Sequence, residues 1–537
     1  MCLNTSLLHN KALFAIYQAH LAINNAKIMA IIIMEKHLAF REKHLGSENM
    51  KLKDLICNLP YQTLQGSDEI EIDNISWDSR KVKPNSLFIC IENKNIDRHN
   101  YAYAAYLNGA SAFIIEHEIN NIPSNATIIK VEDTKKAMAV ISNHFYGEPS
   151  KKLNLIGITG TNGKTSVSYY IASILKDLGH KVGIIGTIEN SIDGKVLKTE
   201  KLNPTTPDSM ELQASLSEMV ESGTNDVVME VSSSALDNHR VDMCDFNIGV
   251  FTNLTQDHLD EHGTMINYKR AKMKLFKMCK CGIINTDDPI FGDIKREALC
   301  DIITYGIYNY ADFTAENVYY SSSGVSFILN FRGIRKSVNI KIPGRFSVYN
   351  SLAAIAACNQ LGIDIDEIIK SISKIKGVKG RFQAIQTSLG FTAVVDYAHS
   401  PDSLENVLSA VKEIKHNKII LIFGCGGNRD KTKRPIMGEI AGKNADCVIL
   451  TSDNPRYENP MDIIKDIESG IKATNCSYKI IEDRKTAIHS GLSLANLGDM
   501  VVIAGKGHED YQIIGDKKIH FDDTEIINDW LEKHQYK

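Results

Sequence analysis

The stretch that most constrains the fold is "LNLIGITGTNGKTSVSYYIASILKDLG", residues 153–179. Its first seven residues are mostly apolar, which predicts a buried strand, and a glycine-rich turn follows directly. Apolar residues then recur at helical spacing from Val167 to Leu178, and Gly179 supplies a stop signal. Strand, glycine turn and helix in this order predict a phosphate-binding unit.

The turn itself carries the residue types that hold phosphate. Its glycines let backbone N–H groups approach phosphate oxygens, and the helix N-terminus favours negative charge. Lys164 can neutralise the β- and γ-phosphates, and the Thr165 hydroxyl can ligate magnesium. The strict GxxxxGK[ST] pattern would need glycine where the chain has Ile158, so a glycine turn with a chance lysine is the alternative. We predict a nucleoside triphosphate site formed by Gly160, Thr161, Asn162, Gly163, Lys164, Thr165 and Ser166.

Length and charge limit the remaining possibilities. With 537 residues the chain is long enough for about three domains. A net charge of -4, from 61 basic and 65 acidic residues, is too balanced for a polyanion-binding surface, so nucleic acid is not an expected partner. The eleven cysteines form no CxxC pair, which indicates neither a disulfide framework nor a cysteine zinc site. A reduced cytoplasm fits best.

The first 49 residues stand apart from the rest. Their apolar residues are interrupted by polar ones from Gln18 to Lys27, which leaves no run near the 18 or more residues that a membrane span needs. No small-residue cleavage pattern of a secretory signal follows. We predict no membrane span and interpret residues 1–49 as an extension outside the fold, with Met50 opening the first domain.

The remainder predicts an α/β protein of three domains. Residues 50–150 mix short apolar runs with helical segments, as in a small N-terminal α/β domain. Residues 151–378 predict a central, P-loop ATPase-like domain with a mostly parallel sheet. Alternating apolar residues in 324–342 predict an appended hairpin, and lysine and glycine at 375–381 predict a linker. Residues 379–537 alternate strands with helix-length segments, which is a Rossmann-like layout.

Polar residues follow several predicted strands. In open α/β sheets, ligands lie outside the carboxyl ends of the strands. In the C-terminal domain those ends carry Asp396 with His399, Arg429, Arg456 and Glu509. If the sheet is parallel, these residues crowd one edge.

Two acidic segments of the central domain predict metal binding. Glu230 ends the apolar run "VVME", where a buried carboxylate needs a metal or cation partner, although a helix-capping or salt-bridged glutamate is an alternative. His258 lies with Asp257 and Asp260 in "FTNLTQDHLDEHG", which alone is compatible with a solvated turn. Beside the phosphate loop, Glu230 and His258 become candidate Mg-ATP ligands.

The segments "GTNGKTS", "NPTTPD", "EVSSSALDNHRVD", "FTNLTQDHLDEHG" and "YKRAKMKLF" occur in this order. Together they resemble the Mur ligases, from about Met50 to the C-terminus. "EVSS" separates the branch that adds the third amino acid to the peptidoglycan precursor from its sister ligases and from folylpolyglutamate synthetases. The resemblance implies a cytoplasmic, monomeric ligase for UDP-MurNAc-L-Ala-D-Glu that uses ATP and Mg²⁺ and forms an acyl phosphate.

The resemblance also implies catalytic residues. It assigns catalysis to Lys164, Glu230, His258 and Lys272, and metal binding to Thr165, Glu230, His258 and a CO₂-derived carbamate on Lys272. From sequence alone, Lys272 is one of four basic residues on a helix, and a solvated face is the simple interpretation. For the adenosine part of ATP the implied contacts are Asn350, Arg381, Asp396 and His399. A helix cap is the simpler interpretation of Asn350.

For the sugar nucleotide, the implied contacts are Ser79, Thr205, Thr206, Ser232, Asn238 and Arg240. A turn before Pro207 is the alternative for Thr205 and Thr206. Two positions depart from the family pattern, since Arg98 stands where glycine is usual and Asn238 where glutamine often occurs.

The third amino acid is meso-diaminopimelate or L-lysine in different members of the family. Diaminopimelate ends in an extra carboxylate, which calls for a forked cationic donor. Arg456 in "DNPR" supplies one, and the implied contacts are Arg429, Asp453, Asn454, Pro455, Arg456, Gly505 and Glu509. The alternative for Arg456 is an ion pair with Glu458 on the surface of a loop. The alternatives for the function are an L-lysine-adding enzyme and an inactive nucleotide-binding regulator. Whether Glu458 orients Arg456 or caps the next helix stays open.

Overall fold

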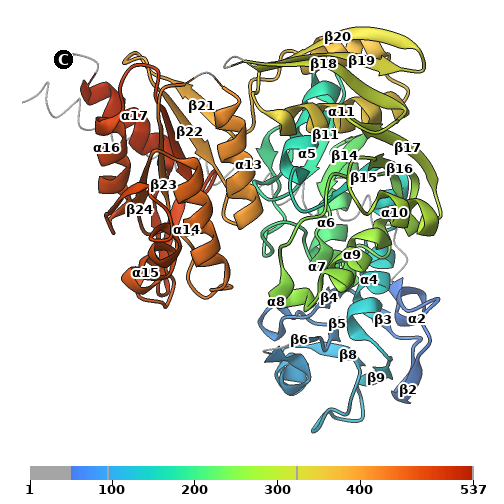
Figure 1. Cartoon of the computed structure of the whole chain (residues 1–537). Coiled ribbons are helices and arrows are strands. Elements are labelled where there is room, and N and C mark those ends of the chain that lie inside the picture. The colour runs from blue at the N-terminus through green and yellow to red at the C-terminus, as the bar shows by residue number, and fades with distance from the viewer. Residues whose placement is uncertain (1–49, 94–95, 322–323, 415, 535–537) are drawn as a thin grey trace, which may run out of the picture. The chain divides into compact units, whose positions relative to one another are not determined.

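The computed structural model describes residues 50–93, 96–321, 324–414 and 416–534. The predicted extension, residues 1–49, lies outside the described residues. The chain divides into two compact units, the first ending at Glu132 and the second beginning at Asp133 (Figure 1). Within the described ranges, no helix is both long and apolar enough to cross a membrane.

The first unit contains a five-stranded sheet in which all neighbouring strands except one edge strand pair in parallel. The strand order is β2 (Gln62–Gln65), β9 (Thr127–Lys130), β8 (Ala110–Ile115), β5 (Ser86–Ile89) and β4 (Asn74–Ser76). Two-stranded pieces and short helices complete it: β1 (Met50–Lys51) with β3 (Glu71–Ile72), β6 (Glu92–Asn93) with β7 (Ile96–Asp97), α2 (Leu52–Leu55), η1 (Ser79–Lys81), η2 (Arg98–Tyr101) and α3 (Ala102–Leu107). The predicted small α/β domain is therefore confirmed.

The second unit begins with an eleven-stranded sheet. Its order is β13 (Lys195–Val196), β12 (Asn190–Ile192), β11 (Val182–Ile185), β14 (Asp226–Glu230), β10 (Asn154–Thr159), β15 (Phe246–Phe251), β16 (Cys279–Asn285), β17 (Asp301–Gly306), β18 (Phe313–Ser321), β19 (Gly324–Phe331) and β20 (Ile334–Ile340). The strands from β11 to β18 pair in parallel, as the sequence predicts.

Helices connect and cover this sheet. They are α4 (Thr134–Phe145), η3 (Pro149–Lys152), α5 (Lys164–Asp177), α6 (Ser209–Glu221), α7 (Ser233–Asp237), α8 (Leu259–His262), α9 (Met265–Met273), η4 (Lys274–Lys277), α10 (Phe291–Glu297), α11 (Arg345–Gln360) and α12 (Ile365–Ile372). Helices α5 and α11 share one buried cluster with the central strands, which includes Ile171, Leu175, Leu352 and Ile355. This packing fixes the start of α5, and with it the phosphate loop, against the sheet.

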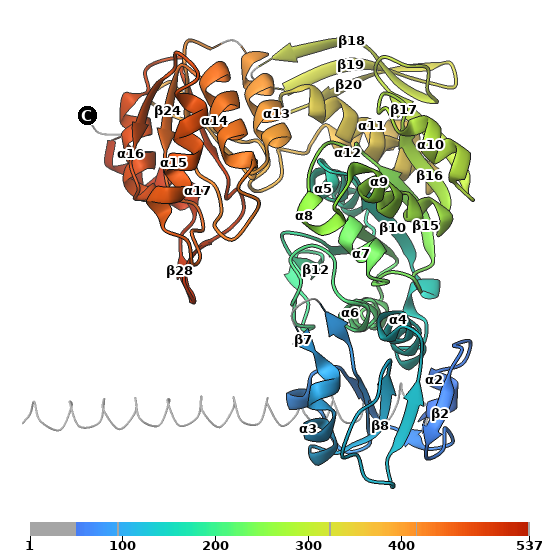
Figure 2. The same cartoon turned by 60° about the horizontal axis from the view of Figure 1, so that its bottom comes forward.

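The predicted hairpin is confirmed as β19 and β20, which lie beside β18 at the end of the sheet (Figure 2). Its two connecting residues, Arg332 and Gly333, have φ angles of 49° and 81°. Positive φ at both positions is the requirement of a two-residue turn whose twist matches the strands. The glycine meets this requirement without strain.

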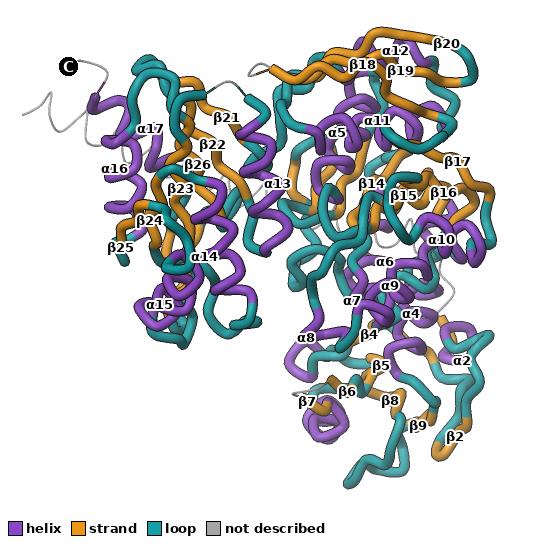
Figure 3. Tube along the Cα trace, viewed as in Figure 1, coloured by secondary structure: helices purple, strands orange, loops and turns teal. Residues whose placement is uncertain are grey.

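The last part of the second unit is a six-stranded sheet between helices (Figure 3). Its order is β21 (Gln383–Gln386), β22 (Thr392–Asp396), β26 (Met500–Ala504), β23 (Ile419–Phe423), β24 (Cys447–Leu450) and β25 (Ser477–Ile480). The helices are α13 (Pro401–Lys412), α14 (Lys433–Asn444), α15 (Pro460–Ile471), α16 (Arg484–Leu494) and α17 (Asp523–His534), and β27 (Tyr511–Ile514) pairs with β28 (Lys517–His520). All strands except β21 run parallel, so the Rossmann-like layout is confirmed and the predicted polar residues follow strands at one edge.

Candidate active site

The phosphate loop joins the end of β10 to the start of α5. Gly160 and Gly163 have φ angles of 149° and 88°, and a side chain on Gly160 would collide with the Thr252 hydroxyl. Lys164 turns back over the loop, where its Nζ donates to the carbonyls of Gly160 and Thr161 at 2.9 and 2.8 Å. Burial lowers the pKa of Lys164. The loop thus holds its lysine beside the backbone that would face a phosphate.

Two residues of the segment "FTNLTQDHLDEHG" that the sequence analysis did not predict as site residues, Thr252 and Asn253, support the loop. The Thr161 amide donates to the carbonyl of Asn253 at 2.8 Å, and the Asn162 amide donates to the Asn253 side chain at 2.9 Å. The Thr252 hydroxyl donates to the Asn162 carbonyl at 2.6 Å. Both residues directly follow β15, which pairs in parallel with β10. The sequence signal that could have identified Thr252 and Asn253 was their position directly after a predicted strand.

Glu230 is buried at the end of β14, with 1% of its surface exposed. Its carboxylate accepts bonds from the Thr165 hydroxyl at 3.0 Å, the Thr187 hydroxyl at 2.9 Å and the Thr187 amide at 2.8 Å. Among the residues that the structure describes, no cation lies within ion-pair distance of Glu230, so its direct hydrogen-bond donors are neutral groups. Thr187, which follows β11, is a second residue that the sequence did not single out.

The Thr165 and Glu230 oxygens fit a magnesium ion. Mg²⁺ prefers oxygen ligands and is bound in nucleotide sites by one or two protein oxygens together with phosphates. The two side chains lie in direct contact beside the phosphate loop, with the Thr165 hydroxyl 3.0 Å from the Glu230 carboxylate. These residues therefore satisfy the chemical requirement of the predicted site.

Lys272 is buried in α9, with 2% of its surface exposed, so the interpretation as a solvated face is wrong. Its Nζ donates to the Gly160 carbonyl at 2.8 Å and lies 4.4 Å from the centre of the Tyr268 ring. Burial and the neighbouring charge of Lys164 hold the pKa of Lys272 well below its ordinary value. A lysine in these surroundings keeps a neutral, nucleophilic amine at lower pH than an exposed lysine does.

His258 is placed differently. Its side chain is 49% exposed, and Nε2 lies 3.5 Å from Asp257. Its ring centre is 6.2 Å from that of Tyr268, which packs under Lys272. The structure therefore brings His258 near the Lys272 side of the site, but shows no contact between it and Glu230.

Two of the four residues predicted for the adenosine part meet the phosphate loop. Arg381 donates to the Thr165 hydroxyl at 3.1 Å, while its Nε is buried without a partner. Asn350 faces Gly163, because its Oδ1 lies 2.7 Å from where a Cβ of that glycine would be. Asn350 is inside α11, whose N-cap is Gly344, so the helix-cap interpretation is wrong.

The other two lie at the end of β22. The Asp396 carboxylate accepts from the amides of Phe382 and Ala398 at 2.6 and 2.8 Å, and thereby anchors the chain that carries Arg381. His399 is exposed, and its Nδ1 lies 2.7 Å from the Tyr397 carbonyl.

The residues predicted for the sugar nucleotide adjoin Glu230. The Thr206 hydroxyl donates to the Glu230 carbonyl at 2.9 Å and accepts from the Ser232 amide at 3.0 Å. The Arg240 guanidinium donates to the Thr206 carbonyl at 3.1 Å, and Thr205 Oγ1 lies 3.3 Å from that of Thr187. Thr205 and Thr206 are thus tied to the strand ends, which a simple turn before a proline would not require.

The remaining two predicted residues of this group have other partners. Asn238 donates to the Ser234 carbonyl at 2.9 Å and accepts from Lys135 at 3.3 Å. Ser79 belongs to the first unit, where its carbonyl accepts from Asn108.

Two arginines gather at the predicted amino-acid site. Arg456 has a φ of 53° and donates from Nη1 to the Gly427 carbonyl at 2.8 Å. A Cβ on Gly426 would lie 2.9 Å from this Nη1 and 3.9 Å from Cγ of Arg429. The hairpin of β27 and β28 holds Arg456 through the Ile513 carbonyl and the Gly515 amide. Glycine at 426 therefore leaves room for both arginines beside the strand ends.

Acidic side chains, and one further lysine, lie on the loops that follow the strands of the same sheet. The Glu509 carboxylate accepts from Asn454 at 2.9 Å and pairs with the fully buried Lys506 at 3.0 Å. Asp453 Oδ2 lies 2.6 Å from where a Cβ on Gly505 would be. The carbonyl oxygen of Pro455 lies against Gly427, where it leaves no room for a side chain. The sequence analysis did not predict Lys506 as a site residue, although Lys506 lies in the strand-end segment "GKGHE".

Comparisons with known proteins identify the family of the chain. Family models match at residues 71–146 (Mur ligase family, catalytic domain), 158–358 (Mur ligase middle domain) and 380–507 (Mur ligase, glutamate ligase domain). A protein of Clostridium acetobutylicum named UDP-N-acetylmuramoyl-L-alanyl-D-glutamate–2,6-diaminopimelate ligase 2 is 48% identical over 482 residues, covering 90% of this chain and 100% of the relative. The chain belongs to the Mur ligase family.

Other relatives agree with this Mur ligase assignment. A 2,6-diaminopimelate ligase of the same name from Caldanaerobacter subterraneus is also 48% identical, over 90% of this chain and 99% of the relative. A solved structure of such a ligase is 32% identical, with a TM-score of 0.66 over 91% of this chain and 100% of that chain. A MurF ligase of Thermotoga maritima in complex with ADP, at 19% identity and a TM-score of 0.57, shares the fold.

Glu458 does not contact Arg456 in this Mur ligase. Its carboxylate pairs with the buried Arg434 at 3.0 Å and with Lys431 at 3.2 Å, and it accepts from the Asn428 amide. The interpretation of Glu458 as a surface partner of Arg456 is therefore wrong. The interpretation of Glu458 as a helix cap is also wrong, because Asn459 is the N-cap of α15. Hydrogen bonding to Arg434 lowers the pKa of Glu458 to about 2. Glu458 ties the loop after β23 to the loop after β24.

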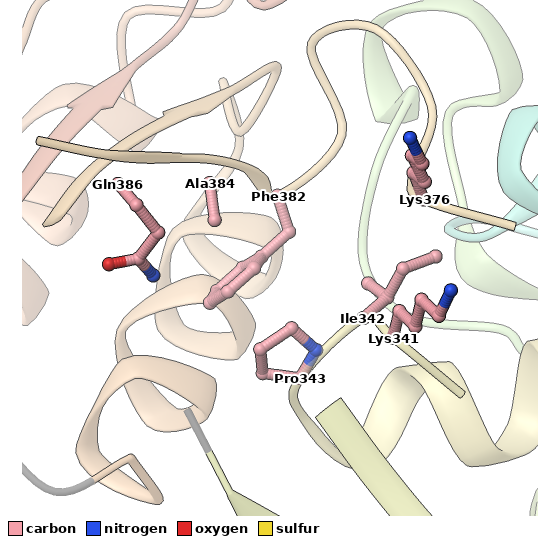
Figure 4. A pocket seen from close by; sticks show the side chains of 7 residues that line it. All are labelled: Lys341, Ile342, Pro343, Lys376, Phe382, Ala384 and Gln386. Carbon is pink, nitrogen blue, oxygen red and sulfur yellow. The ribbon is translucent and has the colours of Figure 1, made fainter. Parts of the chain in front are cut away.

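One pocket of the Mur ligase, of about 450 Å³, lies at the predicted linker. Its lining side chains are Lys341, Ile342, Pro343, Lys376, Phe382, Ala384 and Gln386 (Figure 4). None of them belongs to the phosphate loop or to the strand-end loops.

Proposed function

We propose that this Mur ligase adds meso-2,6-diaminopimelate to UDP-N-acetylmuramoyl-L-alanyl-D-glutamate at the expense of ATP, in the cytoplasmic synthesis of the peptidoglycan precursor. The observation that carries the proposal is the placement of Arg456 and Arg429 around Gly426, next to the loop that carries Glu509. The relatives named for this reaction, at 48% identity over nearly all of their length, support it. We propose that the protein acts as a monomer on small-molecule substrates, with domains at residues 50–150, 151–378 and 379–537.

The first step is the transfer of the γ-phosphoryl group to the substrate carboxylate. It forms an acyl phosphate and releases ADP. Lys164 and the backbone amides of the phosphate loop offset the charge that gathers where a carboxylate meets a triphosphate. Thr165, Glu230 and His258 would hold magnesium, which supplies charge neutralisation when bound. Thr206, Ser232 and Arg240 position the glutamyl carboxylate from the strand ends beside Glu230.

The carbamate on Lys272 is part of the same proposal. The neutral amine of a buried lysine attacks CO₂, and loss of one proton leaves a carbamate anion. Its burial, its lowered pKa and its contact with the Gly160 carbonyl support Lys272 as the modified residue. The carbamate would add an oxygen ligand for a metal ion near the phosphate loop.

The second step is attack of an amine on the acyl phosphate. A bond forms from nitrogen to the acyl carbon, phosphate leaves and the amine loses a proton. Glu509 accepts from the substrate ammonium, while Arg456 and Arg429 address carboxylates. The forked guanidinium of Arg456 gives the distal carboxylate of diaminopimelate a partner that L-lysine would leave unpaired.

Phosphate release measured with each amino acid tests this proposal. We expect a higher kcat/KM with meso-diaminopimelate than with L-lysine. The reverse order would indicate the L-lysine-adding alternative, and ATP binding without any product would indicate an inactive nucleotide-binding regulator.

A further inference from the structure

Lys201 ties the segment that carries Thr205 and Thr206 to the turn after β11. It lies in an irregular stretch between β13 and α6. Its Nζ donates to the carbonyls of Gly186 and Thr187 at 2.6 and 2.7 Å. Hydrogen bonds of this length from an ammonium group are charge-assisted and stronger than bonds between neutral groups. Lys201 therefore holds two successive carbonyls of the turn in one orientation.

The same turn holds the Glu230 carboxylate. The amide and the hydroxyl of Thr187 donate to Oε1 and Oε2 of Glu230 at 2.8 and 2.9 Å. Oε1 also lies 2.5 Å from where a Cβ on Gly186 would be, so only glycine leaves room for the carboxylate there. The carboxylate is thus held by the two residues whose carbonyls Lys201 binds.

One peptide group lies between the lysine and the glutamate. The Gly186 carbonyl and the Thr187 amide are the two ends of this planar group. Lys201 binds its oxygen, and Glu230 binds its N–H. A cation at the oxygen increases the polarisation of the N–H, because hydrogen bonds in a chain polarise one another. The peptide group therefore couples the charge of Lys201 to the carboxylate without an ion pair between the two side chains.

The position of Lys201 is fixed by its charge and by its backbone. Burial lowers the pKa of its ammonium group, and the negative charges of Glu230, Glu211 and Glu189 oppose this lowering. Glu211 also accepts from the Leu202 amide at 3.1 Å, which holds the chain next to Lys201. The lysine is therefore held at both ends of its side chain.

We propose that Lys201 is a positioning residue that sets the orientation of Glu230 as a ligand for the magnesium ion of the nucleotide. It acts through the shared peptide group and does not touch the metal. Its segment also carries Thr205 and Thr206, so the same lysine joins the predicted sugar-nucleotide contacts to the metal ligand. This inference rests on the function proposed above, which places magnesium at Glu230.

Binding of Mn²⁺ to the full chain tests the proposal, because Mn²⁺ takes the same oxygen ligands as Mg²⁺ and is paramagnetic. Free Mn²⁺ is measured by electron paramagnetic resonance in the presence of a non-hydrolysable ATP analogue. The variants are Lys201→Met, which keeps the length but not the charge, and Lys201→Arg, which keeps a cationic donor. Lys198→Met is the matched control, because Lys198 is an exposed lysine of the same segment.

We expect Lys201→Met to raise the Kd for Mn²⁺ by about 10-fold, the lower end of the effect of a residue that orients a metal ligand. Lys201→Arg should restore most of the affinity, and Lys198→Met should bind Mn²⁺ as the wild type does. The titrations contain no amino acid, so they do not depend on which one the ligase adds. A wild type that releases no phosphate would contradict the proposed reaction, whereas the order of the Mn²⁺ affinities decides on Lys201.

Equal Kd values for Mn²⁺ in the wild type and Lys201→Met would overturn the proposal. So would a Lys201→Met protein whose only change is a higher KM for the sugar nucleotide, since Lys201 would then bind that substrate directly. If Lys201→Met fails to fold by circular dichroism, Lys201→Gln, which keeps a neutral donor, is compared with Lys201→Arg. Weaker Mn²⁺ binding by Lys201→Gln supports the proposal, and equal binding overturns it.

Discussion

Replacing Lys272 by methionine should raise the stability of the protein while abolishing its activity. Methionine has nearly the same length but no charge, and Lys272 is 2% exposed. The substitution removes one hydrogen bond, from Nζ to the Gly160 carbonyl at 2.8 Å. That carbonyl keeps a donor, because Lys164 also reaches it, at 2.9 Å. No buried acceptor is therefore left without a partner.

The magnitude follows from the lowered pKa of Lys272. Between its folded pKa and the ordinary value of 10.5, the unfolded chain binds the proton more tightly than the folded protein does. The free energy of unfolding of the wild type therefore rises with pH in this window, and each unit of lowering costs about 1.4 kcal/mol at the acidic end. The lost hydrogen bond offsets about 1 kcal/mol. Methionine carries no charge that burial penalises, so the net effect at pH 7 should be a higher free energy of unfolding for Lys272→Met than for the wild type.

Urea unfolding at pH 7 and pH 10, in buffer free of CO₂, magnesium and ATP, measures this difference. The gap between Lys272→Met and the wild type should be largest at pH 7 and should narrow toward pH 10. Lys269→Met is the matched control, because Lys269 lies on the same helix and pairs with Asp293 at 2.6 Å. Its loss of a partly exposed ion pair should change stability by less than about 1 kcal/mol.

The activity of the Lys272 variants completes the test. Lys272→Met and Lys272→Ala should lose ligase activity, and bicarbonate should not restore it. A short carboxylic acid should restore part of the activity of Lys272→Ala, because it supplies a carboxylate in the space left by the side chain. A Lys272→Met protein that is fully active, or that is less stable than the wild type at pH 7, would refute the reasoning.

Three further substitutions have distinct readouts. Arg456→Ala should raise the KM for diaminopimelate by about 10- to 100-fold, because a charge-assisted hydrogen bond contributes about 1.5–3 kcal/mol. The KM for ATP should change much less. Equal effects on both KM values would mean that Arg456 shapes the fold. Glu230→Gln should lower kcat and raise the magnesium concentration needed for half-maximal activity, and an unchanged magnesium dependence would contradict its role. Glu458 contributes stability that is present above its ordinary pKa and is lost as the pH falls toward about 2. Glu458→Gln should therefore make the free energy of unfolding depend less on pH in this range. An unchanged pH dependence would contradict the ion pair with Arg434.

The parts of the site that lie close together in the sequence were predictable. The phosphate loop is a single strand, turn and helix, so its residues and their chemistry could be inferred from spacing alone. The strand-end residues Arg429, Arg456 and Glu509 could also be predicted, because a parallel sheet brings its carboxyl ends to one edge.

Contacts that depend on which strands are neighbours could not be predicted. Thr187 meets Glu230 because β11 pairs with β14, and Asn253 supports the phosphate loop because β15 pairs with β10. Burial of Lys272 also depends on tertiary packing, since its helix has a mixed sequence of basic and apolar residues. The order of strands in the sheet, which the sequence does not state, decides the first two contacts, and the packing of α9 decides the third.

The sharing of one carbonyl by two lysines explains why the proposed carbamate suits this site. Lys164 and Lys272 both donate to the Gly160 oxygen, at 2.9 and 2.8 Å, so two ammonium groups would lie close together with one neutral acceptor between them. The charge of Lys164 is one cause of the lowered pKa of Lys272. Carbamate formation turns Lys272 from a cation into an anion, and the repulsion between the two side chains becomes attraction. The same arrangement that lowers the pKa of the Lys272 amine would therefore also stabilise the proposed carbamate.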